Sequence, residues 1–260
     1  VHSVEKGKLD SLPGSLQVYL AWEQLHVLLK RMLGPKKTLA MQYSPKNNIP
    51  AVSLVDAGTV ELVRSFGHKV VSSADLVQLF EAVIDEEGYA SHCEAAVLVD
   101  RIRAEAFTRI SEGVRLGNGV SELEITRFIM ERFAQEGLTT ADAPIVGTNE
   151  HPADPHFEST PGNNRPFKHG DTVLIDLWAK KNVPRAIYYD ITWVGYIGDA
   201  PPAQYQEIFD VVVKARDAAV ALVKSKFAKK QPCYGWQLDD AARNVVKTAG
   251  YGRYFVHRTG

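Results

Sequence analysis

Long hydrophobic runs, cysteine pairs and an excess of either charge are all missing from this sequence. No apolar run approaches the ~20 residues that a membrane span needs. The chain has only two cysteines in 260 residues, Cys93 and Cys233, and they are far apart. This spacing makes no metal-spaced cysteine pair, and it favours reduced thiols in a cytoplasmic protein over a disulfide. The lack of a long apolar run predicts no membrane partner.

The formal net charge of −1 argues against nucleic acid as a partner, because phosphate binding needs concentrated Lys and Arg. The one basic run, at residues 224–230, is expected to be a solvated helix end. The sequence begins at Val1 rather than Met and shows no cleavable leader. We expect that preceding residues are missing, so the leader's absence carries little weight.

What is present fits a globular protein, since 45% of the residues are apolar and 23% are charged. Residues 1–87 alternate between helix-like and strand-like patterns, which predicts an α/β unit. Helices are expected at 15–33, 56–67 and 74–85, and strands at 38–44, 51–55 and 69–73.

From residue 88 onward the pattern changes to long amphipathic helices. Residues 92–114 and 122–137 form one predicted pair, with a capping-box pattern at Ser121 and Glu124. A similar pair recurs at residues 205–227 and 236–252, which indicates an internal duplication with a period of about 114 residues.

The two copies are not equally long. Two strand-like runs, 172–179 and 188–197, follow the first helix pair, whereas the second pair is followed only by the strand-like "RYFVHRTG" at 253–260. We therefore expect a domain at 88–260 whose second half is truncated at its C-terminus.

Two carboxylates interrupt the strand-like runs, Asp176 in "VLIDLWA" and Asp190 in "YYDITW". If the turn centres on Val183, they lie directly opposite each other, with Cβ atoms ~5 Å apart. At that distance they would repel by roughly 3 kcal/mol at an effective dielectric of 20. A divalent cation or a shared proton would offset this cost, and a solvated pair on an edge strand or across a bulge remains the alternative.

Histidines add weaker signals. His156 lies in a long loop, "ADPHFEST", and His257 lies on the last strand-like run, "YFVHRTG". Taken alone, the first is a typical surface residue and the second a typical core residue. His151 and His169 look like ordinary loop residues, because their spacing from His156 makes no helix-borne metal pair.

In combination, "PHF", "VLIDLWA", "YYDIT" and "FVHRTG" resemble the M24-type pita-bread metallopeptidases. This family includes Xaa-Pro aminopeptidases, prolidases, methionine aminopeptidases and creatinase. Residues 1–87 look like part of the creatinase-type N-terminal α/β domain, which favours the Xaa-Pro aminopeptidase and prolidase branch. The resemblance implies an α+β fold, with a pita-bread catalytic domain at 88–260.

The resemblance also implies a ligand set of two Asp, one His and two Glu around two divalent ions, Mn, Co or Zn. Asp176 and Asp190 match the two Asp, and Asp190 would bridge the ions. The ligand His directly follows "HRTG" in the family, so it and both Glu are expected beyond Gly260. His156 matches the loop His that contacts substrate, and His257 matches a pocket His that is not a ligand.

Two details complete the match. Thr192 is expected to contact a metal ligand. The interval between Asp176 and Asp190 is three residues longer than the family's commoner spacing, which a longer hairpin turn would absorb.

The implied function is hydrolysis of the bond between an N-terminal residue and proline, through a hydroxide activated by two metal ions. A homodimer is expected of the complete protein, whereas the 260-residue chain itself should be inactive, bind metal weakly and tend to aggregate. The rivals are a creatinase-like hydrolase of a small non-peptide amide and a pita-bread binding module without catalysis.

Overall fold

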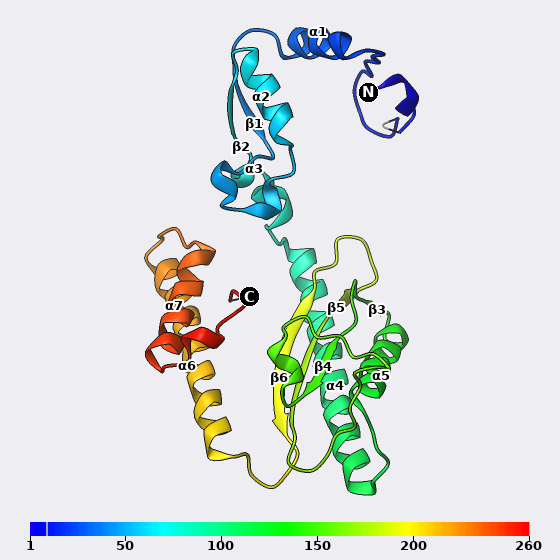
Figure 1. Cartoon of the computed structure of the whole chain (residues 1–260), viewed down its shortest axis with the longest axis vertical. Coiled ribbons are helices and arrows are strands. Elements are labelled where there is room, and N and C mark those ends of the chain that lie inside the picture. Colours follow the sequence, from blue (N-terminus) through cyan, green and yellow to red (C-terminus); the bar gives the residue numbers. More distant parts are fainter. Residues whose placement is uncertain (9, 260) are drawn as a thin grey trace. The chain divides into compact units, whose positions relative to one another are not determined.

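The computed structural model of the protein describes residues 1–8 and 10–259. They form two compact units, Val1–Val83 and Ile84–Gly260 (Figure 1). The units meet four residues before the boundary between 87 and 88 that the sequence suggested. The assignment of the first unit to a creatinase-like domain stays a prediction.

The first unit is a small α/β arrangement. Its elements are α1 (Trp22–Leu33), β1 (Thr38–Met41), α2 (Ala57–Ser65), β2 (Lys69–Ser72) and α3 (Ala74–Glu81). Strands β1 and β2 pair in parallel, and α2 buries Val60 and Val63 next to Val70 of β2. This crossover of strand, helix and strand is the unit that the alternating pattern predicted.

Two local predictions in this unit were wrong. The first helix begins at Trp22 rather than near residue 15, because the side chain of Gln24 accepts hydrogen bonds from the backbone N–H groups of Leu20 and Ala21 and so ends the extended segment there. Residues 51–55 form no strand, since Pro50 opens a short 3-10 helix, Pro50–Val52, in place of a strand with a pairing partner.

The second unit consists of two helix pairs and one sheet. Its elements are α4 (Glu86–Leu116), α5 (Glu122–Gln135), β3 (Leu138–Thr139), β4 (Ile145–Thr148), β5 (Thr172–Lys181), β6 (Tyr189–Tyr196), α6 (Ala203–Ala228) and α7 (Gly235–Thr248). Helices α5 and α7 have the same length, 14 residues, and each follows a much longer helix. The recurrence of a helix pair predicted from the sequence is therefore present.

Local signals explain where the first helix pair begins and ends. The Asp85 side chain accepts a hydrogen bond from Gly88 N at 2.8 Å and caps α4, and Gly117, at φ 68°, ends that helix. The predicted capping box opens α5, because Ser121 N donates to Glu124 Oε2 at 2.9 Å.

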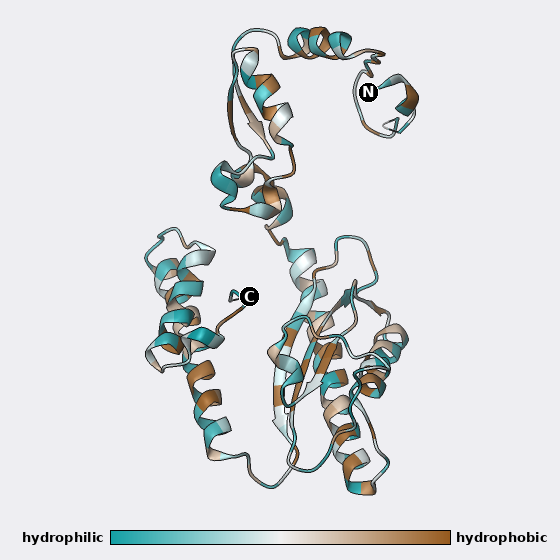
Figure 2. Cartoon of the chain, in the orientation of Figure 1, coloured by the Kyte–Doolittle hydropathy of each residue, from teal (hydrophilic) through white to brown (hydrophobic). Residues whose placement is uncertain are grey.

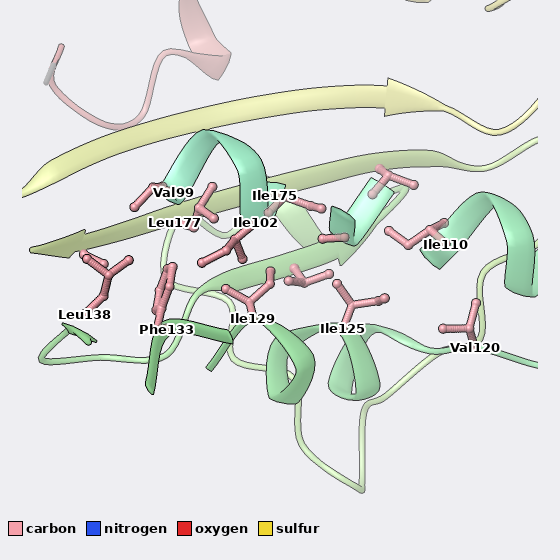
Figure 3. Packing of buried hydrophobic residues seen from close by; sticks show 14 of the residues in the cluster. Val99, Ile102, Ile110, Val120, Ile125, Ile129, Phe133, Leu138, Ile175 and Leu177 are labelled. Carbon is pink, nitrogen blue, oxygen red and sulfur yellow. The ribbon is translucent and has the colours of Figure 1, made fainter. Parts of the chain in front are cut away.

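Strand β5 is the centre of the sheet. It lies between β4 and β6, it also pairs with β3 at its C-terminal end, and all of these pairings are antiparallel. Its side chains alternate in burial, with Val173, Ile175, Leu177 and Ala179 all buried. These four side chains belong to a core shared with α4 and α5 (Figure 3). The opposite face of β5 carries the half-buried residues Leu174, Asp176, Trp178 and Lys180.

The core itself is dense and aliphatic. Ile102 of α4, Ile125 and Ile129 of α5, and Ile175 and Leu177 of β5 are each 0% exposed. Figure 3 shows these residues meeting between the helices and the sheet. Fully burying a side chain of this size stabilises the fold by about 2 kcal/mol. This core therefore holds in place the strand that carries Asp176.

Helices α6 and α7 pack on each other around Ala215, Ala219, Ala242 and Val246. Helix α6 also carries apolar residues along its length, as Figure 2 shows. Six of its large apolar residues are exposed. They are Ile208, Phe209, Val212, Val220, Val223 and Phe227.

The predicted last strand was wrong in its type. In the described part of residues 253–260, a 3-10 helix, Gly252–Tyr254, is followed by a loop that carries His257. A strand exists only with a partner, and no described strand lies beside this segment in any ladder.

Two further predictions concern the whole chain. Cys93 and Cys233 are free and exposed. Among the residues that the structure describes, no helix combines the length and the apolar character that crossing a membrane requires.

Candidate active site

Asp176 and Asp190 lie on the same face of the β5–β6 hairpin. Asp176 pairs with Thr192, and Asp190 pairs with Trp178, so the two Asp are diagonal neighbours rather than directly opposed. The prediction of direct opposition was wrong by two residues. Because a two-residue shift preserves the face of a strand, both carboxylates still project from the side opposite the α4–α5 core.

The shift comes from the hairpin turn, which docks on α4. Ile187 N donates to Ser91 Oγ at 3.1 Å, and the ring of His92 donates through Nδ1 to Tyr188 O at 2.7 Å. Arg185 adopts a left-handed conformation at φ 62° and forms an ion pair with Asp85. These contacts hold a turn centred on Pro184, midway between the paired residues Asp176 and Thr192 and one residue beyond Val183.

Both carboxyl groups are less stable as anions than ordinary aspartates. Partial burial raises the pKa of Asp176, against the opposing effects of the Thr192 hydrogen bond and of nearby His257. Partial burial, and then repulsion from Asp176, raise the pKa of Asp190. A divalent cation between the two would remove both costs, so the pair fits a metal site electrostatically.

Thr192 contacts one of the two carboxylates directly. Its hydroxyl donates to Asp176 Oδ1 at 2.7 Å. The bond occupies one oxygen and leaves Oδ2 for another partner. A hydroxyl in this position fixes the orientation of the carboxylate. That Thr192 contacts a metal ligand stays a prediction, together with the ligand role of Asp176.

The described residues supply only part of a metal coordination sphere. Within 1–8 and 10–259, no group of three or more His, Cys, Asp and Glu side chains is arranged to hold a metal ion. Asp176 and Asp190 therefore fit a metal as two members of a larger ligand set. Their roles as ligands stay a prediction.

The two predicted histidines lie next to each other. The rings of His156 and His257 are 6.0 Å apart between centroids and meet edge to face. His257 is also close enough to Asp176 to lower its pKa. The structure thus brings Asp176, Asp190, His156 and His257 into one neighbourhood, with the loop before β5 and the segment after α7 contributing one histidine each.

One group of residues in this region was missed by the sequence analysis. Glu122, at the first turn of α5, is 0% exposed, and the ring of His151 donates to it at 2.7 Å through Nδ1. His151 is therefore not the ordinary loop residue that its spacing suggested. The Ser121–Glu124 capping box indicated where the helix begins, but no sequence pattern marks Glu122 as buried, because its burial depends on how the loop of residues 149–166 folds back.

Comparison with known proteins identifies the family. The profile described as "Metallopeptidase family M24" matches residues 90–260. The chain belongs to metallopeptidase family M24. The match covers nearly all of the second unit, which has the pita-bread fold of that family, and it confirms the resemblance seen in the sequence.

Among relatives of this M24 chain is an uncharacterized peptidase of Staphylococcus saprophyticus, which is 35% identical over 146 residues, or 56% of this chain and 38% of the relative. Two solved structures share the fold. A prolidase from Thermococcus sibiricus aligns with a TM-score of 0.56 and 19% identity, over 98% of this chain and 64% of its own. An X-prolyl aminopeptidase from Caenorhabditis elegans aligns with a TM-score of 0.62 and 16% identity, over 90% of this chain and 36% of its own.

The M24 chain thus spans between about a third and two thirds of the length of these three relatives, from 36% to 64%.

Proposed function

We propose that the protein is a metal-dependent hydrolase that cleaves the peptide bond between an N-terminal residue and proline. The observation that carries this proposal is the pair Asp176 and Asp190, two partly buried carboxylates on one face of a hairpin, each with a raised pKa. Membership of family M24 supports the hydrolase. The fold shared with a prolidase and with an X-prolyl aminopeptidase described as having a di-nuclear active site supports the substrate and the metal pair.

In this proposal Asp176 and Asp190 would hold two divalent ions, Mn, Co or Zn, as members of a larger ligand set. When bound, such ions supply Lewis-acid polarisation of a carbonyl and an activated water at neutral pH. The resemblance to the family assigns the remaining His and Glu ligands, and a Glu general base, to sequence that follows the "HRTG" motif.

The side chains of this chain would then orient the substrate and stabilise developing charge. Thr192 holds Asp176 in one orientation through its 2.7 Å hydrogen bond. His156 would donate a hydrogen bond to the substrate as negative charge develops on the scissile carbonyl oxygen. His257, edge to face with the His156 ring, would line the pocket as a neighbour rather than as a ligand.

Further parts of the proposal concern the surroundings of the protein. We propose a peptide with proline at its second position as substrate, a homodimer as the assembly of the complete protein and the cytoplasm as its location. Neither nucleic acid nor a membrane is a proposed partner.

The test compares this 260-residue chain with a chain that carries the complete ligand set. Metal content after dialysis and hydrolysis of an Xaa-Pro dipeptide are measured for both, with creatine as the alternative substrate. We expect two bound metals and dipeptide hydrolysis only in the longer chain. If the 260-residue chain holds two metals and turns over the dipeptide, the ligand assignment is wrong, and if the longer chain acts on creatine instead, the substrate is wrong.

A variant separates the role of His156 from metal binding. In the chain with the complete ligand set, His156→Ala should lower kcat by about a hundredfold, the usual scale for one lost transition-state hydrogen bond, while metal content is retained. Loss of metal from the variant would make His156 a ligand. An unchanged kcat would remove it from the mechanism.

A further inference from the structure

Glu122 is a buried carboxylate that the proposed chemistry does not use. It is 0% exposed and accepts three hydrogen bonds. Thr148 N at 2.8 Å and His151 Nδ1 at 2.7 Å donate to Oε1, and Arg165 N at 3.0 Å donates to Oε2. Burying a carboxylate costs free energy unless its oxygens accept hydrogen bonds. The three donors to Glu122 offset this cost, so the fold holds this side chain in one defined position.

The donors come from both ends of one loop. Thr148 is the last residue of β4, and Arg165 lies shortly before β5. The backbone of α5 adds to this closure, because Glu122 N donates to Arg165 O and Leu123 N donates to Asn164 Oδ1, each at 3.0 Å. One side chain at a helix N-terminus therefore joins the two ends of the segment that carries His156, and the helix dipole favours its negative charge.

The third donor, His151, connects Glu122 to the neighbourhood of His156. The ring of His151 stacks on the ring of Phe157, with centroids 4.3 Å apart and an angle of 28° between planes. Phe157 is only 9% exposed, and it directly follows His156. The position of the His156 backbone is thus set by a buried aromatic neighbour, which is held by His151, which is held by Glu122.

We propose that Glu122 and His151 are positioning residues that hold the loop of residues 149–165 so that His156 faces the carboxylate pair. The role of His156 toward substrate rests on the proposed function, whereas the anchoring itself does not. An ionised carboxylate only accepts hydrogen bonds, so Glu122 also requires His151 to carry a proton on Nδ1. This tautomer is a spectroscopic signature of the anchor.

Two variants separate the parts of the anchor. Glu122→Gln keeps the volume but points an NH₂ group at one of the N–H donors, so at least one anchor point is lost. His151→Phe keeps the stack on Phe157 and removes only the bond to Glu122. Thr126→Val is the matched control, because Thr126 is buried in the same helix and its hydroxyl bonds only to Glu122 O, at 3.1 Å.

The first measurement uses the 260-residue chain, with imidazole nitrogen NMR and amide hydrogen exchange. We expect His151 to be protonated on Nδ1 in the parent chain. In Glu122→Gln, amides of residues 149–165 should exchange about tenfold faster, the scale of one lost hydrogen bond to a charged group, and the His156 ring signals should shift. In His151→Phe, the His156 signals should shift while the Arg165 amide stays protected. Thr126→Val should change neither.

The inference is overturned if the His156 signals and the exchange of the loop are the same in both variants as in the control. A His151 ring protonated on Nε2 alone in the parent chain would also overturn it, because its Nδ1 could not donate to Glu122. A thermal melting curve is recorded for each variant, and the NMR and exchange measurements are made well below the lowest melting midpoint. A change seen under these conditions is local and does not come from global unfolding.

The second measurement is kinetic, in a chain that carries the complete ligand set. His151→Phe should lower kcat for an Xaa-Pro dipeptide about tenfold, with KM and metal content unchanged, because a misplaced His156 weakens an interaction of the transition state. An unchanged kcat would overturn the positioning role. A parent chain without peptidase activity would overturn the proposed function instead, and the NMR and exchange results would still decide the anchoring.

Discussion

A single hydroxyl group orients the carboxylate of Asp176. Thr192 sits directly opposite Asp176 in the hairpin register and donates to it at 2.7 Å. The bond lowers the pKa of Asp176, against the larger effect of partial burial, which raises it. A carboxylate held in one rotamer loses less entropy when it binds a cation, so Thr192 should contribute to metal affinity without touching the metal.

This contact leads to a prediction about metal binding. Thr192→Val keeps the branched shape that suits a strand but removes the donor, and it should weaken Mn²⁺ binding by about tenfold to a hundredfold, the usual effect of losing such a partner. Isothermal titration with MnCl₂ measures the change in the chain that carries the complete ligand set, because the 260-residue chain is expected to bind metal weakly. Thr192→Ser restores a hydroxyl and serves as the control. Equal affinity in the Val variant and the parent would show that Asp176 needs no such support.

At the scale of elements, the segment that carries His257 is fastened to α7. Asp239 of α7 accepts from Arg243 Nε at 2.8 Å and from Thr259 N at 2.7 Å. Arg243 in turn donates to Phe255 O at 2.9 Å, and its guanidinium lies 4.1 Å from the centroid of the Phe255 ring. The residues on both sides of His257 are thus tied to one helix through Asp239 and Arg243.

Asp239 should therefore stabilise the chain in a pH-dependent way. The hydrogen bond from Arg243, together with that from Thr259 N, holds the pKa of Asp239 below its ordinary value. A lowered folded-state pKa gives stability that is present above the unfolded value of about 3.9 and is lost as the pH falls through the folded value. Asp239→Asn should cost about 1 kcal/mol at pH 7 and progressively less below about pH 4.

Urea unfolding of Asp239→Asn and of the parent at pH 7 and in acid measures this difference. Asp240→Asn is the matched control, because Asp240 is the next residue on the same helix, is exposed and removes the same charge. A cost that stays constant with pH would mean that packing, and not the ionised carboxylate, accounts for the effect.

The elements also show what could be predicted from the sequence. The ends of α4 and α5 were predictable because Gly117 and the Ser121–Glu124 box act within a few residues. Residues 51–55 and 253–260 were wrongly predicted as strands, because an apolar run becomes a strand only where a partner strand exists. The hairpin register depended on how the turn docks on α4, and the burial of Glu122 depended on a loop more than 25 residues away, at His151 and Arg165.

At the scale of the whole molecule, the residues proposed for catalysis and for positioning all lie in the second unit. Asp176, Asp190, His156, His257 and Glu122 fall within Ile84–Gly260, and the family match over residues 90–260 falls there as well. The residues between α3 and α4 are open to solvent, with Val83 65% and Ile84 52% exposed. The second unit should therefore be separable from the first.

Limited proteolysis tests this division. Thermolysin cleaves before large apolar residues, and we expect its first cut near Val83 and Ile84, which leaves a product of about 177 residues, the difference between 260 and 83. Mass spectrometry identifies the product, and its circular dichroism should remain helical. A first cut within residues 149–165 would contradict both this division and a firmly anchored loop.

The alternation along β5 has a consequence for how this protein could change. Its odd-numbered positions from 173 to 179 fill the core, whereas Asp176 and its even-numbered neighbours face the other way. Substitutions at odd positions should therefore mainly change the stability of the fold, and those at even positions should mainly change the proposed active site. In a saturation library of this strand, selection for soluble protein should constrain the odd-numbered positions, and selection for turnover should constrain the even-numbered positions. Substitutions that alter the proposed activity could then be sampled with little loss of the stability that makes them tolerable.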